Sequence, residues 1–320
     1  MPVERYFLAH TATLKPKEYY KMTKQQIKNS GYIAIIGKPN VGKSTLMNHI
    51  LGKKISITSR KPQTTRHRIL GIKTTENTQV VYVDTPGLHL GYKREMNRVM
   101  NRVAKSVFDE VDAILFLIEA MRWDNEDHAV LQYLKSVNIP VILVINKIDE
   151  VQNKAELLPF IENLSKQYDF AKIFPISAKT GLQVDEMEKT IETLLPHEGD
   201  LFPPEQLTDR SDRFVAAEFI REKLMRMLGD ELPYELTVTI EALEENSKMV
   251  RIAALIWVGK EGQKAIVIGK GGEGLKTVGI QARRSLEAYF EKKVLLKLWV
   301  KVKENWSDDQ RSLKEFGYDE

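Results

Sequence analysis

The sequence contains no cysteine among its 320 residues. This absence excludes disulfide bonds, thiolate metal sites and a cysteine nucleophile, and it suits a reducing compartment. Long apolar runs are also missing, since residues 113–118 and 141–145 fall far short of the roughly 20 residues that a membrane span needs. The first thirty residues lack the apolar segment of a secretory signal. The formal net charge is only +4, so the average composition does not identify a partner.

The chain is long enough for two domains, because domains usually run about 100–200 residues. Its first part alternates apolar, β-branched segments with amphipathic ones. We expect strands at 32–36, 69–73, 79–83, 113–119, 141–145 and 172–176, and helices at 45–50, 94–109, 125–136, 154–167 and 184–195. This order predicts an α/β domain, a mostly parallel sheet with helices on both faces that binds ligands beyond the carboxyl ends of its strands. The polar residues 54–68 predict a mobile loop.

A different pattern follows a proline-containing linker. We expect a helix at 213–228, a hairpin at 234–243 and 249–258, helical segments at 263–268 and 275–290, and a closing strand at 294–302. This order predicts an α+β module. The expected division is an N-terminal extension at 1–29, the α/β domain at 30–197, a linker at 198–208, the second domain at 209–304 and a tail at 305–320. Met22 is a candidate start of the natural chain, and an ordinary extension is the alternative.

A glycine-bounded loop lies between the first expected strand and helix. Residues 37–44 fit the pattern G-x-x-x-x-G-K-[ST] in the context that a phosphate-binding loop requires. The glycines let successive N–H groups point at phosphate oxygens, and the helix N-terminus adds partial positive charge. Lys43 is predicted to reach the β- and γ-phosphates, and Ser44 to ligate Mg²⁺. The predicted contacts are Gly37, Lys38, Pro39, Asn40, Val41, Gly42, Lys43, Ser44 and Thr45.

Three further motifs end expected strands. They are Asp84-Thr85-Pro86-Gly87, Asn146-Lys147-Ile148-Asp149 and Ser177-Ala178-Lys179. Asp84 can hold Mg²⁺ through water, and the Gly87 N–H can meet the γ-phosphate. Each motif alone can be an ordinary turn.

The second and third motifs predict recognition of a guanine base. The Asp149 carboxylate can accept two bonds from the guanine N1–H and 2-amino group, which adenine cannot supply. Asn146 can reach the N7 edge and tie its loop to the phosphate loop, while the Lys147 stem packs on the base. Ala178 can present its N–H to guanine O6. Together, in this order, the motifs select guanine over adenine.

This set of motifs resembles the translation-factor class of GTPases. The resemblance implies that Thr65, rather than Thr64, completes the Mg²⁺ shell when GTP is bound. It assigns Lys43, Thr65 and Gly87 to catalysis and Ser44, Thr65 and Asp84 to the metal. Leu88 is also expected at the nucleotide, at the position where Ras-like enzymes keep a glutamine that orients the attacking water. Leucine cannot do this. The water must then be positioned by the backbone, by another residue such as His67 or His89, or by an ion. Asn40 matches an asparagine that helps bind K⁺ in potassium-stimulated relatives.

The second domain carries the sequence Gly269-Lys270-Gly271-Gly272, which matches the G-x-x-G loop of KH domains of the prokaryotic type. Residues 260–303 carry a formal net charge of +7, more than the whole chain, as expected for a phosphate-rich partner. The predicted RNA contacts are Gly269, Lys270, Gly271, Gly272 and Lys276. Ile266 and Ile268 can floor a groove for bases, although core packing is their expected main task.

The two domains together resemble the Era-like GTPases from residue 31 to the C-terminus, with matching stretches at 218–223, 231–234 and 268–276. The resemblance implies a monomeric, cytoplasmic GTPase that uses GTP/GDP, Mg²⁺ and K⁺. It implies binding near the three-prime end of 16S ribosomal RNA, assistance in small ribosomal subunit maturation, and peripheral contact with the inner membrane.

Three alternatives remain. An RNA-binding scaffold could use GTP as a structural or signalling ligand with little turnover. A double-GTPase ribosome factor is disfavoured by the single phosphate loop, and a membrane or division signalling GTPase would leave the basic G-x-x-G module unexplained.

Overall fold

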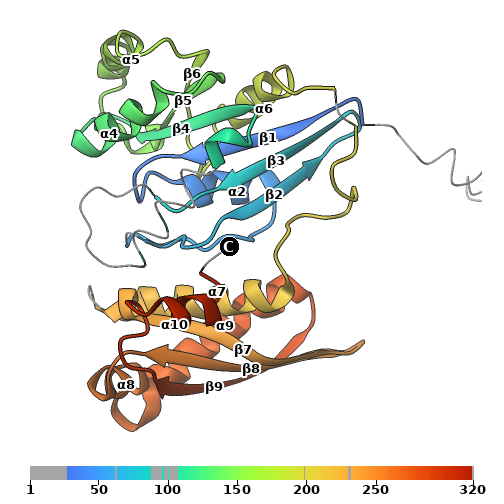
Figure 1. The fold of residues 1–320 in the computed structure, drawn as a ribbon, viewed down its shortest axis with the longest axis vertical. Coiled ribbons are helices and arrows are strands. Elements are labelled where there is room, and N and C mark those ends of the chain that lie inside the picture. The colour runs from blue at the N-terminus through green and yellow to red at the C-terminus, as the bar shows by residue number, and fades with distance from the viewer. Residues whose placement is uncertain are drawn as a thin grey trace, which may run out of the picture.

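A six-stranded sheet forms the centre of the first domain in the computed structural model, which describes residues 27–61, 63–87, 96, 100, 107–197, 199–229 and 232–318 (Figure 1). The strand order is β2-β3-β1-β4-β5-β6. The strands are β1 (Asn29–Ile36), β2 (Ile69–Thr74), β3 (Thr78–Asp84), β4 (Ala113–Glu119), β5 (Val141–Asn146) and β6 (Lys172–Pro175). All neighbouring pairs are parallel except β2 with β3. The carboxyl ends of the parallel strands therefore meet at one edge, as the sequence predicts.

Helices cover both faces of this sheet because its strands are apolar on both sides. They are α2 (Lys43–Leu51), α4 (Asn125–Leu134), α5 (Leu157–Ser165) and α6 (Val184–Glu192), with short 3-10 turns at η2 (Val107–Asp109), η3 (Ile148–Glu150) and η4 (Lys154–Glu156). Leu46 of α2 and Met187 of α6 join the core on one face. Leu131 of α4 and Leu164 of α5 join the core on the other. The single helix expected at 154–167 is instead η4 followed by α5, and most of the helix expected at 94–109 lies outside the described residues.

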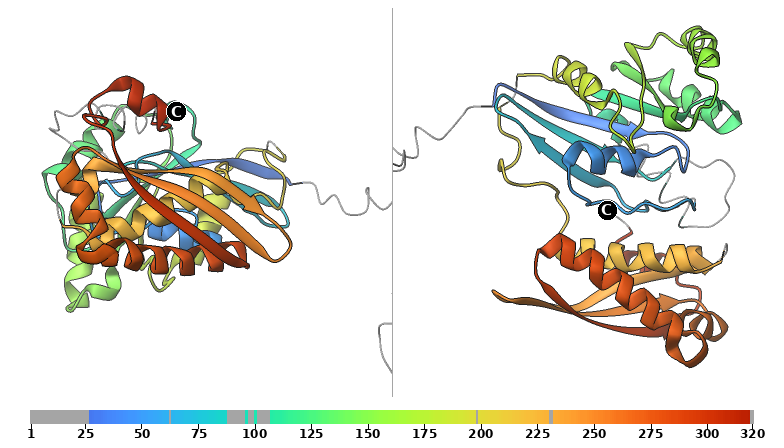
Figure 2. Two further views of the ribbon diagram at one scale, coloured as in Figure 1. Left: turned by 90° about the horizontal axis from the view of Figure 1, so that it is seen from below. Right: turned by 180° about the vertical axis from the view of Figure 1, so that it is seen from behind.

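The second domain is a three-stranded sheet with helices on one face, as the view from behind shows (Figure 2). Its elements are α7 (Asp212–Met227), η5 (Leu232–Glu235), β7 (Leu236–Glu245), β8 (Met249–Val258), α8 (Glu261–Ile268), η6 (Lys270–Gly272), α9 (Glu273–Phe290) and β9 (Lys293–Val302), followed by α10 (Gln310–Glu315) in the tail. β7 and β8 are antiparallel, whereas β9 runs parallel to β8. The core between sheet and helices includes Leu224 of α7, Ile256 of β8 and Ala282 of α9. The predicted hairpin, helices and closing strand are thus confirmed.

The linker ends against the first sheet. The Ile72 N–H donates to the Leu207 carbonyl at 2.8 Å, and the Leu70 N–H donates to the Asp209 carboxylate at 3.0 Å. These bonds cover the outer edge of β2, which would otherwise expose unpaired backbone groups.

Residues 54–68, here called the α2–β2 segment, join α2 to β2 and pack against α7. Its described residues form a loop without helix or strand, as expected, but several of them are buried. Ile55 is 1% exposed, and Ile57 is fully buried among α7 and α9 side chains such as Phe219 and Leu286. The segment is polar on average, so its composition did not indicate that these two apolar side chains would be buried.

A buried carboxylate fixes the segment to α7. Glu222 is fully buried and accepts hydrogen bonds from Lys54 Nζ at 2.6 Å and from the Thr58 N–H at 3.1 Å. Burial alone would raise the pKa of Glu222, but hydrogen bonds from Lys223 and Lys54 outweigh it and lower that pKa to about 2. The carboxylate therefore stays charged at neutral pH and binds both partners as an ion.

Candidate nucleotide site

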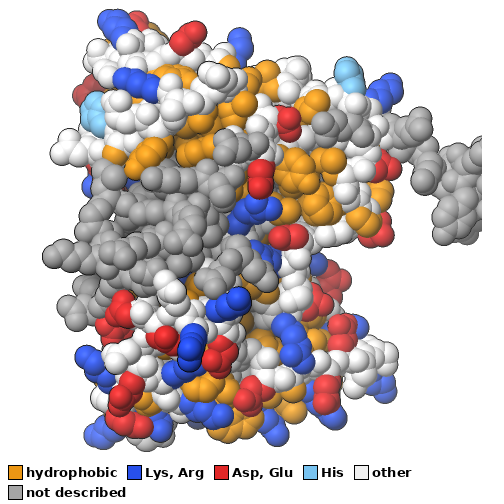
Figure 3. Space-filling model, in the orientation of Figure 1, with side chains coloured by type: hydrophobic (Ala, Val, Ile, Leu, Met, Phe, Trp, Pro, Cys, Tyr) orange, Lys and Arg blue, Asp and Glu red, His pale blue; other side chains and the backbone are white. Residues whose placement is uncertain are grey.

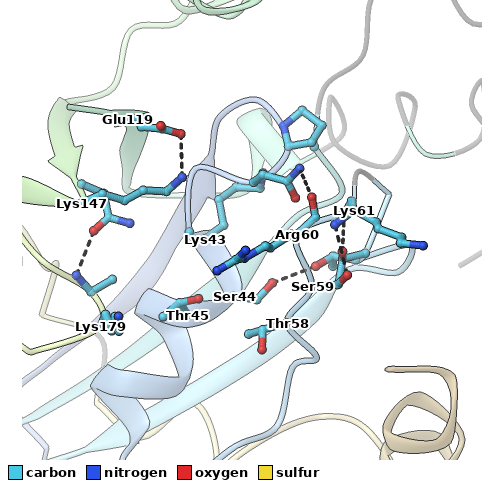
Figure 4. A pocket seen from close by; sticks show the side chains of 18 of the residues that line it. Lys43, Ser44, Thr45, Thr58, Ser59, Arg60, Lys61, Glu119, Lys147 and Lys179 are labelled. Carbon is cyan, nitrogen blue, oxygen red and sulfur yellow. Dashed lines mark hydrogen bonds and ion pairs between the residues drawn. The ribbon is translucent and has the colours of Figure 1, made fainter. Parts of the chain in front are cut away.

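A cavity of about 730 Å³ opens at the carboxyl edge of the first sheet (Figure 4). This volume is typical of small-ligand sites. Its lining includes residues of every motif that the sequence predicts for the nucleotide: Pro39, Asn40, Gly42, Lys43, Ser44, Thr45, Thr65, Gly87, Asn146, Lys147, Asp149, Ala178 and Lys179. The α2–β2 segment supplies a further wall at residues 57–61 and 63–65. Leu88 and His89 lie outside the described residues.

The phosphate loop bends tightly over the start of α2. Gly42 has φ of 106°, and a Cβ at this position would lie 2.2 Å from the Asn146 Nδ2 atom, so only glycine fits there. Lys43 folds across the loop, and its Nζ donates to the Gly37 and Lys38 carbonyls at 2.9 Å each. Burial lowers the pKa of Lys43 to about 8, although the Asp84 charge opposes that change. The loop therefore holds the buried Lys43 amine against its own carbonyl groups. The N-terminus of α2 begins at the same place, and its partial positive charge would favour binding of phosphate there.

A set of oxygen atoms surrounds the Asp84 carboxylate at the end of β3. Its Oδ2 atom accepts from Ser44 Oγ at 2.8 Å and Ser56 Oγ at 2.9 Å. Thr65 Oγ1 lies 2.9 Å from Ser44 Oγ. The Asp84 Oδ1 atom is buried and has no hydrogen-bond partner among the described residues. Burial raises the pKa of Asp84, and the Lys43 charge acts the other way.

This donor set fits Mg²⁺, because that ion prefers oxygen ligands, keeps several waters and binds through one or two protein groups plus phosphate. An unpaired buried carboxylate oxygen is costly, and a hydrated cation beside it would remove that cost. The described residues contain no cluster of three or more His, Cys, Asp or Glu side chains able to hold a metal alone. The metal assignment therefore depends on hydroxyl groups and on the nucleotide itself.

The structure distinguishes the two adjacent threonines of the α2–β2 segment. Thr65 is 6% exposed and faces Ser44. The Thr64 hydroxyl instead donates to the Lys61 carbonyl at 2.6 Å. Only Thr65 is thus placed toward the metal ligands, in agreement with the sequence-based preference.

Asn146 links three of the motifs. Its Nδ2 donates to the Val41 carbonyl at 2.7 Å, and its Oδ1 accepts from the Ala178 N–H at 2.9 Å. The Ala178 N–H, which the sequence assigns to guanine O6, is therefore bonded to Asn146 here. Guanine O6 would have to share this N–H with Asn146 Oδ1 or take the place of that oxygen. The predicted tie between the Asn146 loop and the phosphate loop is present.

Lys147 and Asp149 lie on the wall where a base would pack. Lys147 adopts a left-handed backbone with φ of 68°, and its Nζ donates to Glu119 Oε2 at 2.6 Å (Figure 4). The Asp149 side chain is exposed at the cavity and makes no hydrogen bond within the described part of the chain. Its carboxylate is thus available to a ligand. The sequence analysis did not predict Glu119, which holds the Lys147 side chain, because Glu119 belongs to no recognisable motif.

Several side chains that were predicted to contact the nucleotide are hydrogen-bonded to other parts of the domain. Lys38 Nζ donates to Asp124 at 2.7 Å and Asp127 at 2.6 Å, so this side chain does not point toward the phosphates. Thr85 Oγ1 donates to the Ile35 carbonyl at 3.1 Å. Their contribution to nucleotide binding is then limited to their backbones.

Other predicted side chains also serve the loops themselves. Ser177 Oγ accepts from the Thr180 N–H at 3.2 Å, which closes the turn that holds Ala178. Val41 and Ile148 are apolar and buried. Asn40 Nδ2 donates to the Arg60 carbonyl at 2.7 Å and connects the phosphate loop to the α2–β2 segment.

His67 is a packing residue and not a candidate for positioning water. Its ring stacks on Tyr318 with centroids 4.6 Å apart and meets the Phe214 edge at 5.1 Å. Burial lowers the pKa of His67 to about 4, so the ring is neutral at physiological pH. It is not among the side chains that line the cavity.

A second hollow, of about 350 Å³, lies between α9 and β9 in the other domain, and it is here called the groove of the KH-like module, or KH groove. It is lined by Gly272, Leu275, Lys276, Gly279, Ile280, Arg283, Leu296 and Leu298. Lys270 and Lys276 are exposed beside it. Gly271 has φ of 61°, and a Cβ there would meet no protein atom within 4 Å. The glycine surface is therefore open for a ligand backbone to approach closely.

The expected core role of Ile266 is wrong. Ile266 is 60% exposed, and Val267 is the fully buried residue of α8. Ile268 is half-buried. Helical periodicity allows only one face of this short helix to meet the core, and that face contains Val267. The groove floor is instead built from Leu275, Ile280, Leu296 and Leu298.

These two sites define a P-loop GTPase domain joined to a KH domain. Residues 32–147 match the family of 50S ribosome-binding GTPases, and residues 231–307 match the KH domain family. GTPase Era of Coxiella burnetii is 58% identical over 290 residues, which cover 91% of this chain and 98% of that protein. GTPase Era of Pseudomonas aeruginosa is 52% identical over 90% of this chain and 94% of its own length. The chain belongs to the Era family of GTPases.

Solved structures agree with this assignment. One is Era in complex with MgGDPNP and nucleotides 1506–1542 of 16S ribosomal RNA, which has a TM-score of 0.87 and 41% identity and covers 91% of this chain and 99% of its own. The other is a single-residue variant of Aquifex aeolicus Era bound to GDP and aluminium fluoride, with the same TM-score, identity and coverage. No helix in the described part of this chain has the length and apolar character that crossing a bilayer requires.

Proposed function

We propose that this protein binds and hydrolyses GTP with Mg²⁺, binds small-subunit ribosomal RNA near its three-prime end, and assists small ribosomal subunit maturation. The RNA and the magnesium nucleotide are those bound by the Era relative of known structure. The observation that carries the proposal is the α2–β2 segment, which lines the nucleotide cavity and also packs against the second domain. Thr65 contacts the metal-ligand group, while its neighbours contact the second domain.

The contacts on either side of Thr65 are specific. The Thr64 carbonyl accepts from Arg221 of α7, whose guanidinium is 1% exposed and also donates to Glu218 at 2.6 Å. Arg66 donates to the Leu236 carbonyl at 2.8 Å and the Pro233 carbonyl at 2.7 Å. A nucleotide-dependent movement of Thr65 would therefore change the bonds that hold α7 and β7. We propose that this is how nucleotide state alters access to the RNA groove.

In the proposed site, Lys43 neutralises charge on the β- and γ-phosphates as hydrolysis proceeds. The Gly87 N–H binds the γ-phosphate, and Thr65, Ser44 and the water-linked Asp84 surround the Mg²⁺ ion, which supplies further positive charge at those phosphates. Asp149 reads the guanine edge. The Asn40 side chain, whose Nδ2 donates to the Arg60 carbonyl at 2.7 Å, carries the amide oxygen that would ligate K⁺ beside the phosphates. Leu88 cannot bond the attacking water.

The proposal includes a monomeric protein in the cytoplasm, where ribosomal RNA is found, with peripheral contact at the inner membrane. It also includes the domain division at residues 30–197, 198–208, 209–304 and 305–320, although β1 begins at Asn29, one residue before the proposed boundary.

Phosphate release in the steady state, with and without a short RNA copied from the three-prime end of small-subunit ribosomal RNA, tests the proposal. We expect turnover that responds to RNA, and tighter RNA binding with a GTP analogue than with GDP. Negligible turnover under both conditions would instead favour an RNA-binding scaffold that uses GTP as a structural or signalling ligand. Exchanging K⁺ for Na⁺ in the same assay should lower the rate, and Asn40→Ala should remove the difference.

A further inference from the structure

The strand β9 presents basic and apolar side chains to solvent on the face opposite the helices. Lys293, Leu295, Lys297, Trp299 and Lys301 alternate along the strand, and they are here called the outer stripe. Leu295 is 44% exposed and Trp299 is 45% exposed, and the three lysines are exposed as well. Because strand side chains alternate between faces, all five share one side of the sheet. Figure 3 shows blue and orange surface, with some red, along the lower edge of this domain, where β9 runs in Figure 1.

The neighbouring strand does not cover the outer stripe. Parallel register places Lys297 beside Ala253 and Trp299 beside Leu255. Lys301 Nζ lies 5.6 Å from the Trp257 ring centre and 3.9 Å from Glu241 Oε1. Within the described residues, Lys293 and Lys297 have no ion-pair partner. Most of the positive charge of the stripe is therefore not neutralised by the protein.

Protection of a sheet edge explains only part of this pattern. Lysines on edge strands discourage pairing with other chains, and β9 is an edge strand of its sheet. An exposed tryptophan and leucine between those lysines would have the opposite effect. Positive side chains that alternate with an exposed aromatic ring instead match surfaces that bind single-stranded nucleic acid, where phosphates meet lysines and bases stack on rings.

The other face of β9 belongs to the KH groove. Leu296 and Leu298 line that groove opposite α9, and Lys297 lies between them in sequence with its side chain on the outer face. β9 thus contributes side chains to the groove on one face and to the outer stripe on the other. An RNA strand that leaves the groove over the edge of β9 would meet Lys297 and Trp299 next.

We propose that the outer stripe is a second RNA-binding surface, which binds the single-stranded RNA that continues beyond the groove. The inference rests on the proposed RNA-binding function. A KH groove grips about four nucleotides, so a longer strand requires contacts elsewhere on the protein. In the stripe, Trp299 stacks on a base, and Lys293, Lys297 and Lys301 bind phosphates on either side of it.

Two RNA lengths separate this surface from the groove. Fluorescence anisotropy would compare a groove-length RNA of about five nucleotides with one of about fifteen from the same region. We expect Lys297→Glu/Trp299→Ala to weaken binding of the long RNA by about tenfold or more and to leave the short RNA unchanged. The salt dependence for the long RNA should also become shallower. Trp299→Phe, which keeps a stacking ring, should retain nearly all of the affinity and provides the folding control.

A charge change off the stripe is the matched control. Lys248→Glu alters an exposed lysine of the β7–β8 turn, and we expect it to leave the ratio of the two affinities unchanged. Wild-type affinity of Lys297→Glu/Trp299→Ala for the long RNA would overturn the inference, as would equal losses for both RNAs. Loss of binding only to anionic phosphatidylglycerol vesicles would assign the stripe to lipid and overturn it too. If wild-type protein binds neither RNA, the proposed function itself fails.

Discussion

The nucleotide cavity and the KH groove handle charge in opposite ways. In the cavity, Lys43 is 6% exposed, Asp84 is fully buried and Asn146 is 3% exposed, and all three are bonded to backbone or hydroxyl groups. Beside the groove, Lys270 and Lys276 are exposed to water. A lost partner in the buried site leaves other groups unpaired, whereas a lost surface charge is screened by salt. Substitutions should therefore have large, salt-independent effects in the first site and smaller, salt-dependent effects in the second.

The largest effect is expected for Lys43→Ala. Removing the buried cation leaves the developing charge on the phosphates uncompensated, so hydrolysis should fall by on the order of 10²–10³-fold, with weaker nucleotide binding. Phosphate release and equilibrium binding measure both quantities. Lys166→Ala changes an exposed lysine of the α5 C-terminus and serves as control. Normal turnover in the folded Lys43 variant would contradict the role assigned to the buried amine.

Asp149→Asn should have the next largest effect. The carboxylate is exposed to the ligand but binds through two charge-assisted hydrogen bonds, so GTP affinity should fall by about a hundredfold and selectivity should shift toward XTP. Competition between GTP and XTP measures the shift. The adjacent Glu150→Gln is the matched control, since Glu150 also lines the cavity and is exposed. Unchanged selectivity would show that Asp149 does not read the base.

In the second domain, Lys270→Asp/Gly271→Asp should lower RNA affinity by about tenfold or more, and the loss should depend on salt. The fold should survive, because the left-handed backbone of Gly271 tolerates aspartate and a Cβ there meets no protein atom. Anisotropy over a salt series, with circular dichroism, measures these effects, and GTP affinity provides an internal control. Wild-type RNA binding by the folded variant would show that the G-x-x-G loop does not hold the RNA.

The smallest effect concerns pH. The pKa of Lys43 is about 8 in the structure, and bound phosphates would raise it, so binding takes up a proton above that pH. GTP affinity should therefore decline several-fold between about pH 8 and pH 9.5. Lys43→Arg, which stays charged, should abolish this decline. Calorimetry in two buffers of different ionisation enthalpy detects the proton directly, and equal heats in both would contradict the prediction.

The same contrast explains what the sequence could and could not predict. The strands and the glycine-bounded loops are encoded locally, in apolar runs and in short motifs at strand ends, so their positions were predicted to within a few residues. The choice of Thr65 over Thr64 came from the resemblance to translation-factor GTPases, and Thr65 does lie beside Ser44. Most of the nucleotide cavity can thus be placed without coordinates.

Contacts between distant segments were not predictable. Nothing local to Ser56 indicates that its hydroxyl reaches Asp84, and nothing local to Ile57 indicates its partners on α7. Ile266 and Val267 are equally apolar, and only the register of α8 against the core decides which is buried. The bond between Asn146 and the Ala178 N–H likewise depends on how two loops meet in space.

The burial of Ile57 has a consequence for the order in which the chain matures. Ile57 is part of a core that includes Val215 of α7, Leu286 of α9 and Val294 of β9. During synthesis, those partners leave the ribosome more than 150 residues after Ile57 does. Domains generally fold from the N-terminus as they emerge. The sheet and phosphate loop can therefore form early, but the segment that carries Thr65 acquires its final position only when the second domain is nearly complete. A truncated nascent chain would hold the parts of a nucleotide site without the final position of the segment that joins that site to the second domain.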